Sequence, residues 1–196
     1  MALVRMVDRD EVPPDVRATF DEGEKKYGKV LDAWRVIAHN PGIFKTYFPF
    51  LQSVFAPGAL DQRTKQLSAV RVTILNHSRY ALSHRLDASK KDGIPVEDLV
   101  ALGDLDRNRD RFTEAELAAL DFTDELTTRT DEVGFREDPL GVSKETISRL
   151  QEHFKDAEIV DLAMSVSIWN FLSRFLRVMD FDLDMDPPPP ELDAVI

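Results

Sequence analysis

The sequence predicts an all-α protein, with a single helical domain over residues 1–183 and a Pro-rich acidic tail, extended in conformation, over residues 184–196. Three observations predict this class. Apolar residues recur at intervals of three and four along most of the chain. Helix-capping residues and prolines separate the periodic segments. No segment shows the alternation of apolar and polar residues that is typical of a half-buried strand.

One long segment, from Asp61 to Gly93, is predicted to be the central helix. Asp61 is a good N-cap, Gly93 is a good residue just past a helix end, and no proline lies between them. The second half of the segment carries most of the reactive side chains, on two neighbouring stripes of one helix face. The first stripe contains His77, Tyr80 and His84, and the second contains Ser78, Ala81 and Arg85.

The other helices are predicted from their caps. Asn40 and Pro41 suit the N-cap and first position of a helix, and Thr113 with Glu116 forms a capping box. Pro49 is expected to kink its helix or to lie in the first turns. The predicted helices cover about 15–26, 30–38, 41–55, 96–102, 113–126, 143–154 and a long segment from 156. The segments 1–13, 103–111 and 127–142 are predicted to be extended or connecting.

Composition excludes several classes of function. The net charge is −11 with no basic stripe, which argues against nucleic-acid binding. The chain has no cysteine, so thiolate catalysis, disulfides, Fe–S clusters and cysteine zinc sites are excluded. The acidic N-terminus does not resemble a signal peptide, and no apolar run approaches the roughly 18 residues of a membrane helix. We therefore expect a cytoplasmic protein with no membrane partner.

Three segments resemble the alkylhydroperoxidase-D / carboxymuconolactone decarboxylase-like superfamily. They are AHNPGIFKTYFPF (38–50), the central segment (60–94) and IVDLAMSVSIWNFLSRFLRVMDFDL (159–183). The resemblance implies a helical bundle, self-association and chemistry without a cofactor. The aromatic-rich stretch 44–55 also suits packing between subunits, so we expect a homo-oligomer.

The family's central helix carries a Glu, then a pair of cysteines and a His, and its decarboxylase branch has a Ser and a Tyr instead of the cysteines. An ungapped placement fills these positions with Gln66 for the Glu, Ser78 and Ala81 for the two cysteines, Tyr80 for the Tyr and Arg85 for the His. A one-residue gap would put His84 at the catalytic His position. That gap would have to be closed again before Gly93, so the ungapped placement is preferred.

The candidate catalytic residues are Tyr80, His84 and Arg85. A guanidinium binds a carboxylate or phenolate bidentately, whereas a phenol or an imidazole can move a proton. Further candidates for substrate binding are Gln66, Arg71, His77, Ser78, His39, Asn170 and Arg174. The alternative for each of them is structural, as an ion pair, a helix cap or a core residue.

No metal and no cofactor are predicted. His77 and His84 lie two turns apart, beyond the one-turn spacing of helix chelators. The aspartates at 180, 182, 184 and 186 lack the glycine and glutamate of a calcium loop, so a solvated acidic tail is expected.

The leading hypothesis is a cofactor-free lyase that acts on an anionic, ring-derived small molecule, as in the catabolism of aromatic compounds. Decarboxylation is the reaction that the resemblance implies, and another carbon–carbon cleavage is equally open. The alternative is a non-catalytic relative that binds a ligand or a protein partner. Thiol peroxidase activity is argued against, because there is no sulfur nucleophile.

Overall fold

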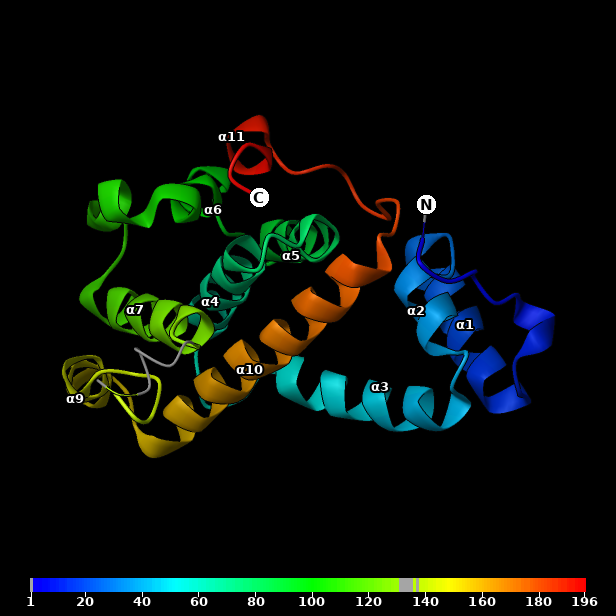
Figure 1. The fold of residues 1–196 in the computed structure, drawn as a ribbon, viewed down its shortest axis with the longest axis horizontal. Helices are drawn as coiled ribbons and strands as arrows, with labels where there is room; N and C mark the ends of the chain where they lie inside the picture. The colour runs from blue at the N-terminus through cyan, green and yellow to red at the C-terminus, as the bar shows by residue number, and fades with distance from the viewer. Residues whose placement is uncertain (1, 131–135, 137) are drawn as a thin grey trace.

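The computed structural model describes residues 2–130, 136 and 138–196, and every regular element in them is helical (Figure 1). The elements are η1 (Arg9–Glu11), α1 (Pro14–Tyr27), α2 (Asp32–Ile37), α3 (Pro41–Phe55), α4 (Gln62–Leu75), α5 (Arg79–Lys91), α6 (Val96–Ala101), η2 (Leu102–Arg111), α7 (Glu114–Thr128), α9 (Lys144–His153), α10 (Asp156–Met179) and α11 (Pro190–Asp193). The all-α prediction is confirmed. Part of the predicted connection 127–142 lies outside the described residues.

The predicted helix starts coincide with side-chain caps. Asn40 accepts a hydrogen bond from the Ile43 N–H at 3.1 Å, and Asp61 accepts one from the Thr64 N–H at 2.9 Å. Thr113 and Glu116 form the reciprocal capping box that starts α7. These caps satisfy N–H groups that a helix leaves unpaired, so short local signals were sufficient to place the starts.

The predicted central helix is wrong in one respect, because it is divided into α4 and α5. Asn76, His77 and Ser78 form the break, and His77 adopts a left-handed conformation with φ 51°. The N–H of Ser78 donates to the Thr73 carbonyl at 3.0 Å and that of His77 to Ile74 at 2.9 Å, which is a Schellman ending. Glycine normally marks this ending, so its absence hid the break.

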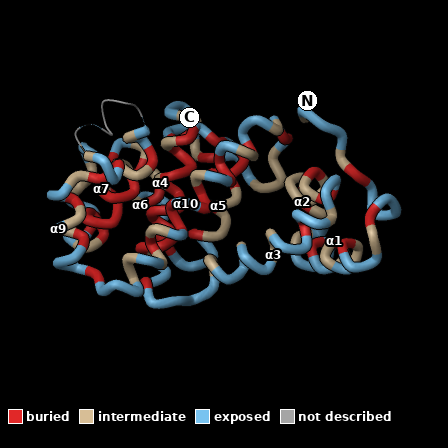
Figure 2. Tube along the Cα trace, turned by 60° about the horizontal axis from the view of Figure 1, so that its bottom comes forward, coloured by how far each residue is buried: buried red, intermediate tan, exposed pale blue. Residues whose placement is uncertain are grey.

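The core centres on α4, which contacts α5, α7 and α10. Figure 2 shows the buried residues concentrated where these helices meet. A smaller core holds the N-terminal segments together, and it consists of Val7, Val12, Val16, Phe20, Ala38 and Phe44. The long helix α3 runs from this small core to the main one (Figure 1), and a cavity lies between them.

The acidic tail is not simply extended, contrary to expectation. In Figure 1 it leaves the end of α10 beside α2 and returns to α11. Leu192 of α11 is fully buried with Leu99 and Leu102, and Asp193 pairs with Arg79 at 2.6 Å. The tail is therefore part of the packed structure, and one of its aspartates, Asp184, contacts a residue of the cavity wall, Tyr80.

Helix α10 is the one described helix whose length and composition would let it cross a membrane, but its buried side faces the core. The opposite side carries an exposed apolar row. Its members are Val160, Met164, Phe171 and Val178, which recur at four- and seven-residue intervals.

The break between α4 and α5 gives a test of backbone strain. A residue with a Cβ in the left-handed region is strained by roughly 1–2 kcal/mol, whereas glycine is not. We expect His77→Gly to be more stable than His77→Ala by roughly 0.5–1 kcal/mol, measured by denaturant unfolding. Equal stability of the two variants would contradict the Schellman ending at His77.

Candidate functional site

A cavity of about 580 Å³ lies between α1, α2 and α3 on one side and α4, α5 and α10 on the other. Its wall is mainly aromatic and aliphatic. The main apolar contributors are Trp34, Tyr47, Phe48, Leu51, Phe55, Trp169, Leu172 and Leu176. Four predicted site residues also line the cavity, namely Gln66, Tyr80, His84 and Arg85. Apolar walls with a few convergent polar groups are typical of small-molecule sites.

Arg85 supplies a positive charge to this wall without a matching carboxylate. Its guanidinium carbon lies 4.4 Å from the ring centre of Trp169 and 5.1 Å from that of Phe55. Nη1 donates to Gln66 Oε1 at 3.2 Å, and the carboxylates of Asp92 and Asp87 act on the guanidinium through their charge without forming an ion pair with it. Burial lowers the pKa of Arg85, but an arginine side chain remains protonated at neutral pH. The aromatic faces stabilise the cation but do not neutralise it.

Three buried polar atoms near Arg85 have no hydrogen-bond partner among the described residues. They are Arg85 Nε, Trp169 Nε1 and Ser165 Oγ, and all three residues line the cavity. Each atom can donate a hydrogen bond, and unsatisfied buried donors are costly. A ligand oxygen with negative charge is the complement of this set.

Tyr80 lies against a carboxylate that the sequence prediction missed. Its hydroxyl donates to Asp184 of the tail and accepts from the Ala33 N–H at 3.3 Å. Asp184 also accepts from the Asp32 N–H at 2.9 Å and pairs with Lys29 at 2.6 Å. The Asp184 side chain is fully buried. The proton of Tyr80 is thus directed to Asp184 and not toward the cavity.

The charges around this group shift two pKa values in opposite directions. Burial would raise the pKa of Asp184, but contacts with His84, Lys29 and Tyr80 outweigh it and hold the pKa well below its ordinary range. Burial, followed by the negative charge of Asp184, raises the pKa of Tyr80 far above its ordinary value. At neutral pH Asp184 is therefore a carboxylate and Tyr80 a neutral phenol.

His84 lies between the carboxylate and the cavity. Its Nε2 is buried, has no hydrogen-bond partner and faces Asp184 Oδ2 at 3.8 Å. Its ring centre is 4.6 Å from that of Tyr80. His84 is a cavity residue with a carboxylate behind it, an arrangement that suits an imidazole that exchanges protons.

Gln66 links the cation to the rim of the cavity. Its Oε1 accepts from Arg85, and its Nε2 donates to Asp92 Oδ2 at 2.6 Å. Since both ends of the amide are engaged, Gln66 holds Arg85 in place.

The remaining predicted residues do not line the cavity. His77 is exposed at the helix break, and Ser78 is buried at the start of α5. His39 is exposed and donates to the Arg5 carbonyl oxygen at 2.8 Å. Asn170 and Arg174 both bind Asn76, at 2.9 and 3.1 Å, so they stabilise the end of α4.

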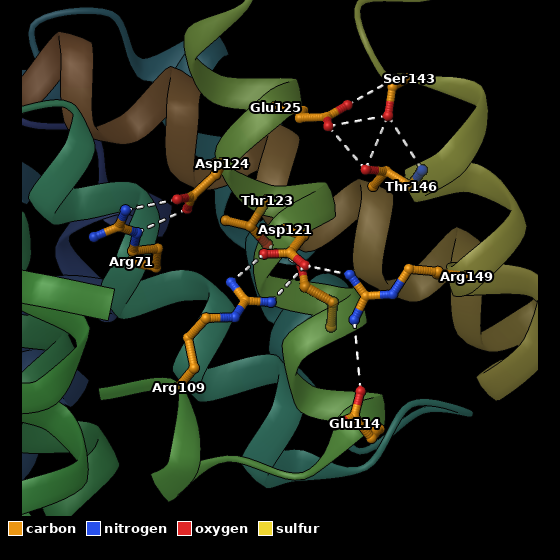
Figure 3. Close-up of polar contacts among 11 residues, drawn as sticks. Arg71, Arg109, Glu114, Asp121, Thr123, Asp124, Glu125, Ser143, Thr146 and Arg149 are labelled. Atoms are coloured by element: carbon orange, nitrogen blue, oxygen red, sulfur yellow. Dashed lines mark hydrogen bonds and ion pairs between the residues drawn. The ribbon is translucent and has the colours of Figure 1, made fainter. Parts of the chain in front are cut away.

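Arg71 belongs to a network of ion pairs around α7 (Figure 3). It binds Asp124 bidentately at 2.7 and 2.6 Å and donates to the Leu102 carbonyl oxygen at 2.6 Å. A separate group of ion pairs lies on the same helix, where Asp121 accepts from Arg109 and Arg149. Arg71 therefore ties α4 to α7 and is not available to a ligand.

No group of three or more potential metal-ligating side chains is close enough to hold a metal ion in the part of the chain that the structure describes. Tail residues Asp182 and Asp186 are exposed, whereas Asp184 is turned inward.

Comparison with known proteins agrees with this geometry. Residues 41–125 match the model of the carboxymuconolactone decarboxylase family, a range that includes α4 and α5. No curated protein matches the chain. The solved structures that it resembles share its fold at low sequence identity.

One of these structures is the debrominase Bmp8 in its apo form, with a TM-score of 0.77, 20% identity, and coverage of 99% of this chain and 98% of that one. A Cys-to-Ala variant of Bmp8 in complex with 2,3,4-tribromopyrrole has a TM-score of 0.75, 19% identity, and coverage of 100% and 96%. An uncharacterized peroxidase-related protein from Silicibacter sp. TM1040 has a TM-score of 0.74, 18% identity, and coverage of 98% and 93%.

The contacts of Arg71 predict a structural role. Arg71→Ala leaves a partly buried carboxylate without its partner, so we expect a loss of about 1.5–3 kcal/mol in the free energy of unfolding. Asp124→Ala removes the same pair, so the double variant should lose less than the sum of the two single losses. Denaturant unfolding of the three variants measures this, and strictly additive losses would contradict the pairing.

Proposed function

We propose that this chain, whose residues 41–125 match the model of the carboxymuconolactone decarboxylase family, acts without a cofactor on a small ring compound with one anionic group. The observation that carries the proposal is the uncompensated Arg85 in an aromatic cavity. In this role Arg85 binds the anion, Gln66 orients Arg85, and His84 moves a proton.

The proposal of a single anionic group rests on the other charges of the wall. Lys65 is occupied by the Val54 and Ala56 carbonyl oxygens at 3.3 and 3.1 Å. Lys91 pairs with Asp87 at 2.7 Å. Two cations of the described lining form no ion pair, namely Arg85 and the exposed Lys26, which lies over the Tyr27 ring. Arg85 is the inner one of the two, and a second ligand charge would meet the carboxylates of Asp87 and Asp92.

The preference for a ring rests on the shape and chemistry of the wall. Trp34 and Trp169 line the cavity, and Phe55 stacks on Trp169 with ring centres 5.1 Å apart. Flat apolar surfaces of this kind favour planar ligands. The tribromopyrrole complex of Bmp8 is a ring ligand on the same fold, and it supports the class of compound but not its identity.

The reaction that suits these residues is carbon–carbon cleavage of the decarboxylase type. In a decarboxylation the bond to the carboxylate carbon breaks, carbon dioxide leaves, and the electron pair is delocalised onto a ring oxygen, so that Arg85 balances the same single negative charge before and after the step. The imidazolium of His84 then protonates the ring-derived carbon. Bmp8 carried a cysteine at the position of its Ala substitution, but this chain has no cysteine, so no thiol step is proposed here.

The alternative is a relative that only binds a ligand or a protein partner. A chain that only binds would not need a cation and an imidazole together around one cavity, and Arg85 and His84 both line it. We therefore favour catalysis over binding alone.

Arg85 provides the direct test of the anion site. The probe is benzoate, and the readout is the fluorescence of Trp34 and Trp169, the chain's two tryptophans, which both line the cavity. A charge-assisted contact in a partly dry cleft contributes on the order of 2–4 kcal/mol, so Arg85→Ala should weaken benzoate binding roughly 30- to 1,000-fold. Arg85→Lys should recover little of this, because it lacks the planar fork.

Two controls accompany this titration. Benzamide has the same ring without the charge, so its affinity should change little in Arg85→Ala. Arg63→Ala removes an arginine that pairs with Asp98 and Glu116 outside the cavity and should bind benzoate as wild type does. Unchanged benzoate affinity in Arg85→Ala would reject Arg85 as the anion site.

We also propose that two or more copies associate through the exposed apolar row on α10. Val160, Phe171 and Val178 are 60%, 54% and 58% exposed on one side of the helix. Covering such a row removes apolar surface from water. Light scattering of the wild-type protein should give a multiple of the monomer mass of 22.3 kDa. Phe171→Glu should lower the measured mass toward that of the monomer. A wild-type particle of the monomer mass at micromolar concentration would refute association.

A further inference from the structure

We propose that Asp184 is the positioning residue of this site: it holds His84 with Nε2 directed at its carboxylate, so that Nδ1 is the nitrogen that exchanges a proton with the ligand. The proposal rests on the proposed function, because it assigns His84 the proton transfer. It adds a residue from the C-terminal tail, more than 90 positions from α5, to a site otherwise built from the helices.

The geometry places Asp184 where three parts of the chain meet. Its carboxylate accepts from Tyr80 of α5 and from the Asp32 N–H at the start of α2, and it pairs with Lys29 in front of α2. Phe181 of the same tail packs on the ring of Tyr80, with ring centres 5.0 Å apart. The carboxylate is thus held by several independent contacts and cannot rotate away without losing them.

His84 is the one neighbour whose hydrogen bond to Asp184 is not closed. Nε2 is buried without a partner, and it lies 3.8 Å from Oδ2, a little beyond hydrogen-bond distance. A small rotation of the imidazole closes this gap. When Nε2 carries the hydrogen that points at the carboxylate, Nδ1 keeps its lone pair and is the nitrogen that can exchange a proton with the ligand.

A purely structural role for Asp184 predicts something different. A carboxylate that only fastens the tail to Lys29, Asp32 and Tyr80 has no influence on the reactivity of His84. The amide of Asn keeps the size of the side chain and one acceptor oxygen but lacks the charge. Asp184→Asn therefore separates the electrostatic effect on His84 from the packing of the tail.

The test is the rate at which diethyl pyrocarbonate modifies each histidine of the full-length chain at pH 8, followed by peptide mass mapping. No substrate is needed. The chain's other histidines, His39, His77 and His153, are exposed and serve as internal references. If the carboxylate activates the imidazole, Asp184→Asn should slow the modification of His84 roughly three- to tenfold and leave the references unchanged.

Two matched variants test whether position or charge matters. Asp182→Asn and Asp186→Asn remove the same charge from exposed positions of the same tail and should leave the His84 rate unchanged. An unchanged or faster His84 rate in Asp184→Asn would overturn the proposal, because the tail would then act only as a cover. A loss of reactivity in all three variants would also overturn it.

A second measurement needs no variant and remains decisive if Asp184→Asn does not fold. Long-range ¹H–¹⁵N spectra of the wild-type protein identify the protonated ring nitrogen of His84. The proposal requires a hydrogen on Nε2, and a hydrogen on Nδ1 instead would overturn it. Benzoate affinity in Asp184→Asn separates the proposed function from the proposed role of Asp184. If this variant binds benzoate as wild type does and its His84 reactivity is also unchanged, the role of Asp184 is rejected and the anion site at Arg85 is not.

Discussion

The structure depends on one buried anion. A carboxylate that leaves water must be matched by hydrogen bonds or cations, and Asp184 recruits its partners from α2, α5 and the segment before α2. Satisfying this charge ties α2 and the segment before it to α5, and it acts together with α3 and with the packing of Val36 of α2 in the main core. The cavity is the space that this arrangement leaves between the small N-terminal core and the main core. Its dimensions are thus set by an electrostatic requirement as much as by apolar packing.

The two charged groups beside the ligand space, Asp184 and Arg85, have opposite surroundings. Asp184 is surrounded by donors that compensate it, whereas Arg85 is surrounded by aromatic faces and one amide. A compensated anion is a fixed part of the protein, but an uncompensated cation favours the entry of a negative ligand. The compensated group can therefore support the chemistry of a neighbour, while the uncompensated one selects what binds.

The sequence was informative where a feature depends on neighbouring residues. The caps at Asn40, Asp61 and Thr113 are local hydrogen-bond patterns, so the helix starts could be predicted. The break at His77 could not, because its left-handed conformation is stabilised by the packing of α4 and α5 and not by a glycine. Arg71 and Asp184 were misjudged for the same reason: their partners are distant in sequence, and an acidic tail looks solvated until its contacts are known.

The two possible alignments to the family motif, which place either Arg85 or His84 at the catalytic His position, are compatible in the folded chain. Successive residues of a helix are rotated by about 100°, so His84 and Arg85 point in different directions from α5. Both nevertheless line the cavity, because it extends around the helix from the Asp184 side to the Trp169 side. Under the proposed function, one register supplies the anion-binding group and the other the proton-transfer group, so the two roles are divided between adjacent residues.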